Sequence, residues 1–214
     1  CSNISSIHIS KNVEKIGKYA FYSCTNLQKV SFSDGSKLNF VDNSAFSKCS
    51  KLNSIKLPEK LKVIGKDCFS YTGLTSIQIP HLIEKIEAKT FYHCEELSKV
   101  TFNERIKEIG EFSFSHDITI RTINIPDSIE IIQQYAFSEC YNLRKLKTST
   151  NTKLVEIHEG SFEYTQIEEL NINSSARILF SPRHVNKLKQ IKFQGGPPSF
   201  FYQTKEGNIY EKTN

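Results

Sequence analysis

Six cysteines and six histidines are the residues of this 214-residue chain that could bind a metal or act as nucleophiles. Their spacing favours neither role. No C-x-x-C pair is present, which argues against a structural zinc site. No nucleophile elbow, phosphate-binding loop or pair of carboxylates occurs either. We therefore predict that the chain is not an enzyme and that it holds neither a metal nor a cofactor.

The cysteines recur at one position of a repeated pattern. The sequence AFYSCTNLQKVSF at 20–32 is followed by AFSKCSKLNSIKL at 45–57 and AFSECYNLRKLKT at 136–148. A catalytic site needs its residues once, whereas repetition at fixed offsets indicates architecture. The cysteines at this position are Cys1, Cys24, Cys49, Cys94 and Cys140, and Cys68 takes a nearby alanine position. Free cysteine packs as a small hydrophobic residue, so we predict reduced thiols in the core, with a Cys24–Cys49 disulfide as the alternative.

The alignment of the repeats also brings two histidines and a glutamate to the same repeat position. His93 and His116 lie two residues after the repeated phenylalanine in consecutive repeats, and Glu139 holds that position in the next. Such a group could bind a metal weakly or respond to pH. The favoured interpretation is that these are exposed polar residues on the side away from the strands.

The repeat itself is anchored by phenylalanine. Its members are Phe21, Phe46, Phe69, Phe91, Phe114, Phe137 and Phe162, spaced 22–25 residues apart. The unit can be written I-x-x-I-G-x-x-A-F-x-x-C-x-x-L-x-x-I-x-I-P. Its L-x-x-I-x-I part alternates with period two, which predicts a strand with one buried face, and proline then ends the pairing. Its A-F-x-x-C part is too short for an independent helix and should form a single helical or 3₁₀ turn.

The repeats predict a solenoid, because no single unit can bury its own apolar face. About eight units of 22–25 residues fill 1–195, and 196–214 is a C-terminal tail or cap. Residues 1–9 match 24–32 position by position, so the solenoid starts in the middle of a repeat. The chain contains no methionine, so we expect it to be processed or a fragment. No apolar run is long enough for a membrane span, so we predict no membrane insertion within this chain.

This pattern resembles the BspA-type leucine-rich repeat, whose unit is close to L-x-x-I-x-I-P-x-x-V-x-x-I-G-x-x-A-F-x-x-C. The resemblance covers residue 1 to about 194. It departs from the family at the Cys position (Thr72, Asp117, Thr165) and at the Gly position (Asp42, Glu87, Gln133, His158). It implies an α/β solenoid: a right-handed leucine-rich repeat superhelix with a parallel β-sheet on one face and short helical or 3₁₀ turns on the other.

The resemblance also implies a function. Similar proteins are usually at the cell surface or secreted, and several are adhesins in host–pathogen interaction. We therefore expect a non-catalytic binding or adhesion module that recognises a host matrix protein or another cell surface. The alternative is an intracellular (cytoplasmic) leucine-rich repeat scaffold for protein–protein interaction, which free thiols would suit.

The outward-pointing strand residues form the candidate binding face. They carry six lysines and one glutamate, in a chain of net charge +5. The candidate ligand-binding residues are Lys29, Lys56, Gln78, Lys99, Asn124, Lys145, Lys147, Asn171 and Lys192. Spaced lysines favour an acidic protein surface, such as host extracellular matrix, or an anionic glycan. Equally, an exposed sheet face must be polar to stay soluble.

Two further features bear on the partner. No aromatic residues are interleaved with these lysines, so we predict no nucleic-acid binding and low affinity per site. Two sequons, at Asn3 and Asn173, are possible glycosylation sites in a secreted eukaryotic chain, although such triplets are common by chance.

Overall fold

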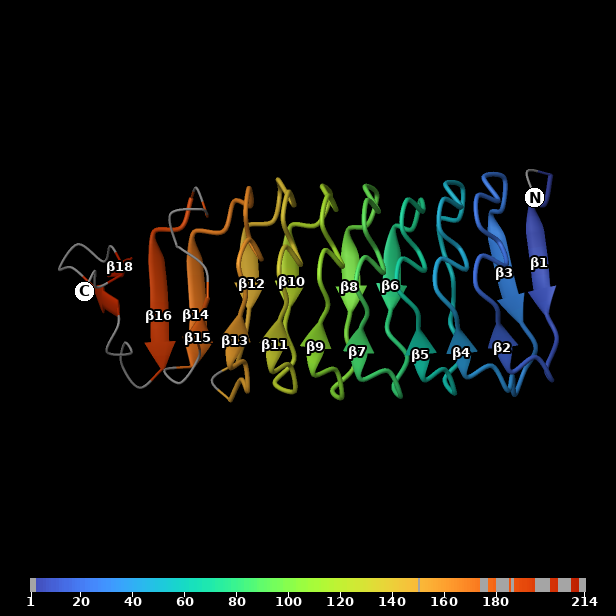
Figure 1. The fold of residues 1–214 in the computed structure, drawn as a ribbon, viewed down its shortest axis with the longest axis horizontal. Helices are drawn as coiled ribbons and strands as arrows, with labels where there is room; N and C mark the ends of the chain where they lie inside the picture. The colour runs from blue at the N-terminus through green and yellow to red at the C-terminus, as the bar shows by residue number, and fades with distance from the viewer. Residues whose placement is uncertain are drawn as a thin grey trace.

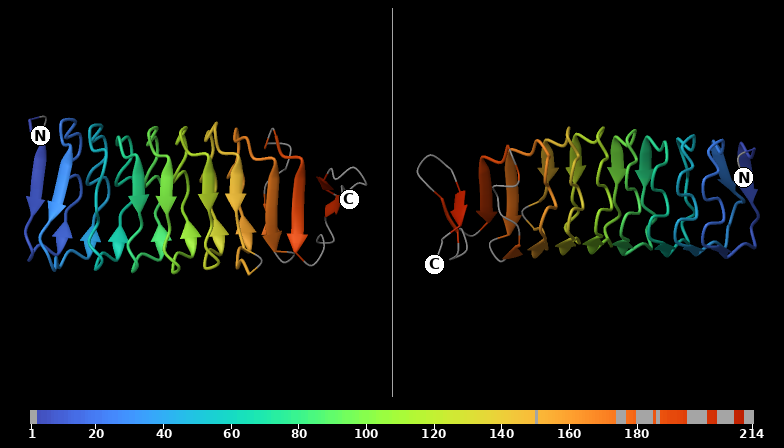
Figure 2. Two further views of the ribbon diagram at one scale, coloured as in Figure 1. Left: turned by 180° about the vertical axis from the view of Figure 1, so that it is seen from behind. Right: turned by 45° about the horizontal axis from the view of Figure 1, so that its top comes forward.

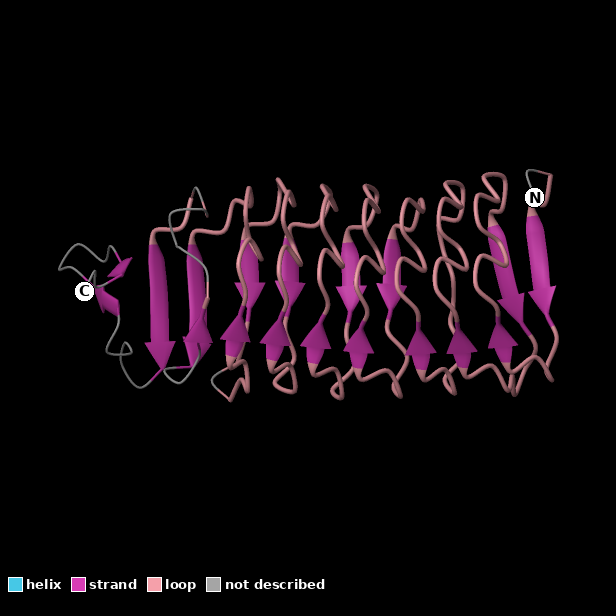
Figure 3. Ribbon diagram, viewed as in Figure 1, coloured by secondary structure: helices cyan, strands magenta, loops and turns pink. Residues whose placement is uncertain are grey.

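A computed structural model describes residues 3–149, 151–173, 177–179, 185, 187–194, 201–203 and 209–211. Over these residues the chain is an elongated stack of about eight coils, with its two ends at opposite ends of the stack (Figure 1). Each coil runs through a first row of strands, a tight corner, a second row of strands and a turn that contains the repeated phenylalanine. The described part contains no helix, and therefore none that could cross a membrane (Figure 3).

The two rows of strands lie on different sides of the stack (Figure 2). The first row, here called the strand face, contains β1 (Ser6–Ile9), β3 (Lys29–Phe32), β6 (Ser76–Gln78), β8 (Lys99–Thr101), β10 (Thr122–Asn124), β12 (Lys145–Lys147), β14 (Glu169–Asn173) and β16 (Gln190–Gln194). The second row, here called the second face, contains β2 (Lys15–Ile16), β4 (Phe40–Val41), β5 (Val63–Ile64), β7 (Lys85–Ile86), β9 (Glu108–Ile109), β11 (Ile131–Ile132), β13 (Glu156–Ile157) and β15 (Arg177–Ile178). All pairs within these rows are parallel.

The second face corrects the predicted architecture. The sequence indicated one parallel sheet with helical turns on the other side, but that side carries a second parallel sheet of two-residue strands. The sequence shows an aliphatic residue five positions before each phenylalanine, and this residue lies in the second-face strand. Because a strand of two residues is too short to show an alternating pattern, the sequence did not predict these strands.

The phenylalanine column confirms the predicted core. The seven rings stack along the whole described repeat, with centroids 5.2–5.8 Å apart. Six of them are fully buried, and Phe21 in the first coil is partly exposed. Burial of a phenylalanine side chain stabilises the folded state by about 1.5–3 kcal/mol, so a column that crosses every coil is a large share of the cohesion of the stack.

The turn around each phenylalanine is not helical, which corrects the second part of the predicted fold class. We call it the Phe turn. In every coil the residues two before and two after the phenylalanine have left-handed backbone angles, with φ between 52° and 67°. The N–H groups of these two residues and of the phenylalanine bond to carbonyls of the next coil, for example Phe69 N to Thr90 O at 2.8 Å. A helix would instead direct every N–H back along its own chain.

The hydrogen bonds between Phe turns form a continuous ladder. Each of the six junctions from Phe21 to Phe162 has three of these bonds, all of 2.8–3.2 Å. The remaining turn residues bond locally, as Cys24 N does to Phe21 O at 3.1 Å. The turns therefore satisfy their backbone by stacking, which is why an isolated repeat would not keep this conformation.

The strand face is less regular. It consists of separate parallel pairs, β1–β3, β6–β8, β10–β12 and β14–β16. Residues 53–57 occupy the position between β3 and β6 but form no strand. The second face is interrupted once over its described length, between β5 and β7. Figure 1 shows a wider interval between those two strands than between their neighbours.

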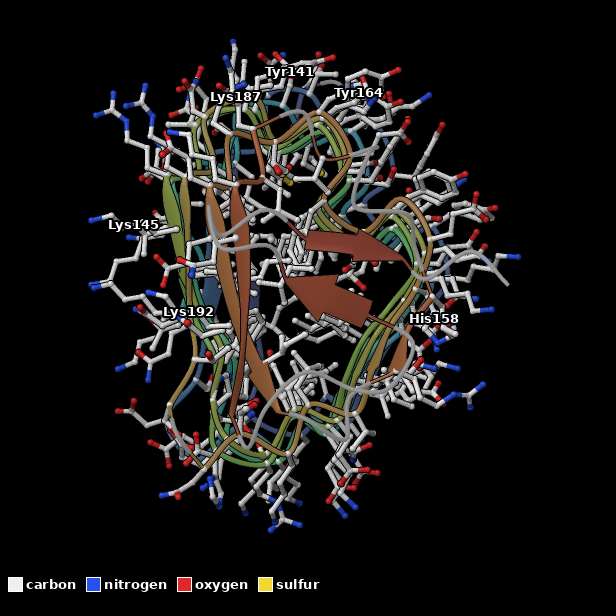
Figure 4. All side chains as sticks on the ribbon, turned by 90° about the vertical axis from the view of Figure 1, so that its left-hand side faces the viewer. Tyr141, Lys145, His158, Tyr164, Lys187 and Lys192 are labelled. Carbon is white, nitrogen blue, oxygen red and sulfur yellow. The ribbon has the colours of Figure 1, made fainter. Side chains whose placement is uncertain are left out.

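The chain beyond the stack contains an antiparallel pair, β17 (Phe201–Gln203) with β18 (Ile209–Glu211). Figures 1 and 4 both place this hairpin at the C-terminal end of the stack. Residues 196–200, 204–208 and 212–214, which belong to the predicted tail, lie outside the described residues. The domain boundary at 195 and the role of the tail as a cap stay predictions.

Candidate binding site on the strand face

The strand face displays the predicted residues as expected. In β6, β8 and β12 the central residue is buried and the two flanking residues are exposed. All nine candidate residues are exposed except Asn171, which is half-buried. In Figure 4, Lys145 and Lys192 project from the same side of the stack, whereas Tyr141 and Tyr164 lie at the Phe-turn edge and His158 lies on the opposite side. The alternation therefore predicted correctly which side chains share this face.

Most lysines of this face have no acidic partner. Lys192 forms an ion pair with Glu169 of the neighbouring coil. The other five strand-face lysines, Lys29, Lys56, Lys99, Lys145 and Lys147, form no ion pair with any described residue. Their ammonium groups are solvated and available to an anionic ligand.

The charges of the second face are arranged differently. Lys15 bonds to Asp42 at 2.8 Å, Lys85 to Glu108 at 3.2 Å, and Arg177 to Glu156 at 3.1 Å, each across a coil junction. The hydrogen bond from Lys15 holds the pKa of Asp42 below its usual range. The cations within the second-face strands are therefore paired, whereas five of the six strand-face lysines have no acidic partner among the described residues.

Open grooves accompany the breaks in the strand face. One of about 900 Å³ spans residues 54–57 and β6, and another of about 440 Å³ lies between β3 and residues 56–60. A third, of about 610 Å³, lies between β12 and β14. A continuous sheet would have buried these edges, so the interruptions create the concave surface that a flat ladder lacks. The sequence did not predict these grooves.

The cysteines are structural, as predicted. Cys24, Cys49, Cys68, Cys94 and Cys140 are buried free thiols, which excludes the Cys24–Cys49 disulfide in this structure, and Cys1 lies outside the described residues. The Cys94 thiol donates to Phe69 O of the neighbouring coil at 3.0 Å. Burial raises the pKa of Cys49 to about 12, so this thiol stays protonated and is a poor nucleophile.

Asp117 occupies the Cys position of its coil and is fully buried. Its Oδ1 accepts from the Cys94 N–H at 2.8 Å, but its Oδ2 has no hydrogen-bond partner among the described residues. Burial raises the pKa of the Asp117 carboxyl well above its usual range, because the charged form would lose its hydration. The site is a core defect, and it is enclosed rather than open to a substrate.

The histidine cluster is closer-packed than expected. His93 and His116 stack with ring centroids 4.0 Å apart, and His116 Nε2 lies 3.0 Å from Glu139 Oε1. Both rings are half-buried rather than exposed, which corrects that interpretation. Partial burial, followed by the charge of His93, lowers the pKa of His116. In the described part of the chain no group of three or more His, Cys, Asp or Glu side chains is arranged to hold a metal ion.

Of the two sequons, Asn3 is exposed. Asn173 lies at the end of β14, and its side chain is outside the described part. Modification of either residue stays a prediction.

Comparisons with known proteins agree with this architecture. The sequence profile of the BspA type leucine rich repeat region, in six copies, matches residues 1–95 and 62–182. Because these matches span well over half of the chain, the protein belongs to this family, as its repeat predicted. No curated protein matches the chain significantly.

Solved structures show the same fold. A leucine-rich repeat protein from Bacteroides ovatus is similar over 90% of this chain, with a TM-score of 0.78 and 24% identity. One from Eubacterium ventriosum is similar over 89% of it, with a TM-score of 0.50 and 19% identity. The chain spans 56% of the first protein and 60% of the second. At these identities the likeness concerns the fold alone.

Proposed function

We propose that this chain is a non-catalytic binding module of a cell-surface or secreted protein, and that its strand face recognises a protein partner such as host matrix or another cell surface. The observation that carries the proposal is the row of exposed lysines without acidic partners, held at fixed spacing by a rigid stack. Such a row accelerates encounter with an acidic surface and makes binding sensitive to salt. Membership in a family of binding repeats supports the same conclusion.

A substitution series with a matched control tests the role of the strand face. We expect the triple variant Lys56→Gln, Lys99→Gln, Lys145→Gln to bind purified extracellular matrix proteins roughly tenfold more weakly at low salt, since each exposed contact contributes about 0.2–1 kcal/mol. The thermal midpoint should not change. The control, Lys62→Gln, Lys107→Gln, Lys153→Gln, removes three exposed lysines away from the strand face and should bind as the original chain does. Equal binding by all three proteins would exclude the strand face.

The cellular location is tested separately. If the module is displayed outside the cell, an impermeant amine-reactive label applied to intact cells will modify it. An intracellular scaffold, the alternative function, would be labelled only after lysis. The free thiols of the chain are compatible with a reducing compartment, and they are the observation that supports the intracellular alternative.

A further inference from the structure

One junction of the stack lacks the hydrogen bonds that the others have on the second face. At the other five junctions between Phe21 and Phe162, two N–H groups of each coil bond to the preceding coil: the one seven residues before the phenylalanine and the one four residues before it. Lys107 N to Glu84 O at 2.8 Å and Gly110 N to Ile86 O at 2.9 Å are examples. The corresponding bonds from Glu84 and Glu87 to the preceding coil are missing. We call this junction, between residues 54–64 and 76–87, the seam.

The strand face is open at the same junction. Residues 54–57 make no backbone hydrogen bond, either to β3 or to β6. The seam is closed near the Phe turns, where Asp67, Phe69 and Tyr71 donate to the next coil at 2.8–3.0 Å, and at the adjoining corner, where Thr75 N bonds to Asn53 O at 3.1 Å. The two coils are thus bonded at the Phe-turn edge and the adjoining corner, and no backbone hydrogen bond joins residues 54–64 to residues 76–87.

A shortened corner lies at the seam. The spacing from Phe69 to Phe91 is 22 residues, the smallest in the chain. The missing residue lies in the corner Thr72–Leu74, which replaces the four residues Cys24–Leu27 of the first coil. A Cβ on Gly73 would lie 2.5 Å from Ser50 O, so the short corner is pulled tightly onto the preceding coil. The Phe69 and Phe91 rings are also the most widely separated of the column, at 5.8 Å.

The strand-face groove at the seam is cationic. Its volume is about 900 Å³, and Lys29, Lys56 and Lys60 line it without an ion pair to any described residue. The other ionisable groups along it are Glu59 and His81. The half-buried side chains of Ile55 and Leu82 add apolar surface.

The groove between β12 and β14 provides an internal comparison. It also contains three basic residues, Arg144, Lys145 and Lys147, but Glu168 and Glu169 line it too. Those two carboxylates already pair with Lys189 and Lys192 of the next coil. They would repel an anionic ligand, so of these two grooves the one at the seam is the better anion site.

We propose that the seam groove is the principal docking site of the module and that it takes an extended acidic segment of a protein partner, with apolar side chains between the acidic ones. The inference rests on the proposed binding function of the strand face. Three unpaired ammonium groups complement carboxylates, and Ile55 and Leu82 accept apolar side chains. The unpaired N–H and C=O groups of residues 54–57 match a peptide backbone, which offers both kinds of group.

The test uses a fluorescein-labelled decapeptide of eight glutamates and two leucines, with a glutamine version as the neutral control. We expect Lys29→Gln, Lys56→Gln, Lys60→Gln to weaken its binding about tenfold or more. The matched variant Arg144→Gln, Lys145→Gln, Lys147→Gln removes the same charge and should lose less than about threefold. Equal losses in the two variants would overturn the seam site while leaving the strand-face function intact.

A second variant separates shape from charge. Replacing Thr72 and Gly73 with the three residues Cys-Thr-Asn restores the 23-residue spacing and keeps all three lysines. If the groove is the site, this folded variant binds the acidic peptide about tenfold more weakly; unchanged binding overturns the role of the seam. Failure of the unaltered chain to bind the peptide, or binding to heparin alone, overturns the acidic peptide as occupant. By contrast, the strand-face function itself fails only if the Lys56, Lys99 and Lys145 series leaves matrix binding unchanged.

Discussion

The Phe turns and the strand face belong to the same stack of coils, yet the row of Phe turns is continuous and the strand face is interrupted. The Phe turns keep three hydrogen bonds at each of six junctions, and their rings form an unbroken column. The strand face is divided into pairs of strands, with one coil forming no strand there at all. Cohesion along the stack therefore resides mainly at the turn edge.

This difference allows the strand face to vary. A break in a sheet that carried the stack would separate the coils, whereas a break in this sheet opens a groove. Irregular spacing, such as the short corner at Thr72–Leu74, is tolerated because the Phe turns still hold the neighbouring coils together. Binding surfaces can thus be built by small length changes in a scaffold that does not depend on them.

The largest effect should come from removing a ring of the column. Phe114 is fully buried between Phe91 and Phe137, so we expect Phe114→Ala to lower the free energy of unfolding by about 3–5 kcal/mol. Chemical denaturation followed by circular dichroism measures this change. Tyr141→Ala, which truncates an exposed ring, should change it by no more than about 0.5 kcal/mol. Similar losses in both variants would contradict the assignment of cohesion to the column.

A smaller effect, a gain in stability rather than a loss, is expected at Asp117, where the repeat lacks its usual cysteine. Asp117→Cys restores the residue found in the neighbouring coils and removes an unpaired buried oxygen, which should stabilise the chain by roughly 1–3 kcal/mol at pH 7.

The pH dependence of that gain identifies its cause. Burial raises the pKa of the Asp117 carboxyl, so protonation of this carboxyl stabilises the folded state of the protein. The contribution of the protonated carboxyl to the free energy of unfolding is fully present below about pH 3.9, the pKa of Asp in the unfolded chain. It is lost as the pH rises through the pKa that Asp117 has in the folded state. The advantage of Asp117→Cys should therefore shrink between pH 7 and pH 4. Thr165→Cys is the control, because the Thr165 hydroxyl is already bonded to Phe162 O at 2.7 Å; a pH-dependent change there would contradict this explanation.

The smallest effect concerns the stacked histidines. The pKa of His116 is lowered by partial burial and by His93, so the folded state favours the neutral ring. The contribution of the neutral His116 ring to stability is fully present above about pH 6.5, the pKa of His in the unfolded chain. It declines as the pH falls through the pKa that His116 has in the folded state. Because the ring is partly exposed, we expect a decrease of only about 1 °C in Tm between pH 7 and pH 5. His116→Gln should abolish the decrease, while His81→Gln should leave it in place.

The sequence predicted what repeats at fixed offsets. The positions of Phe69 and Phe91 in the column, the buried cysteines and the exposed lysines all follow from the register, because each coil faces the same neighbours as the next. The predicted solenoid and its family were confirmed on that basis.

The sequence did not predict the backbone of the turns or the breaks. The left-handed positions hold Tyr19, Lys48 and His93 rather than glycine, so no local signal marks them; inter-coil hydrogen bonds hold these angles. The seam coincides with a single missing residue near Gly73, where the corner packs tightly on the preceding coil. Both features arise from contacts between coils, which the sequence of one repeat does not contain.

Amide hydrogen exchange resolved to single residues is the most direct test of the contrast between the continuous Phe turns and the two interrupted faces. At the seam, the amides of Asp67, Phe69 and Tyr71 should be as protected as those at other Phe turns, because their bonds to the next coil are intact. The amides of Glu84 and Glu87 should exchange at least about tenfold faster than those of Lys107 and Gly110. Equal protection of these four amides, or earlier exchange at the Phe turns than on the strand face, would contradict the account.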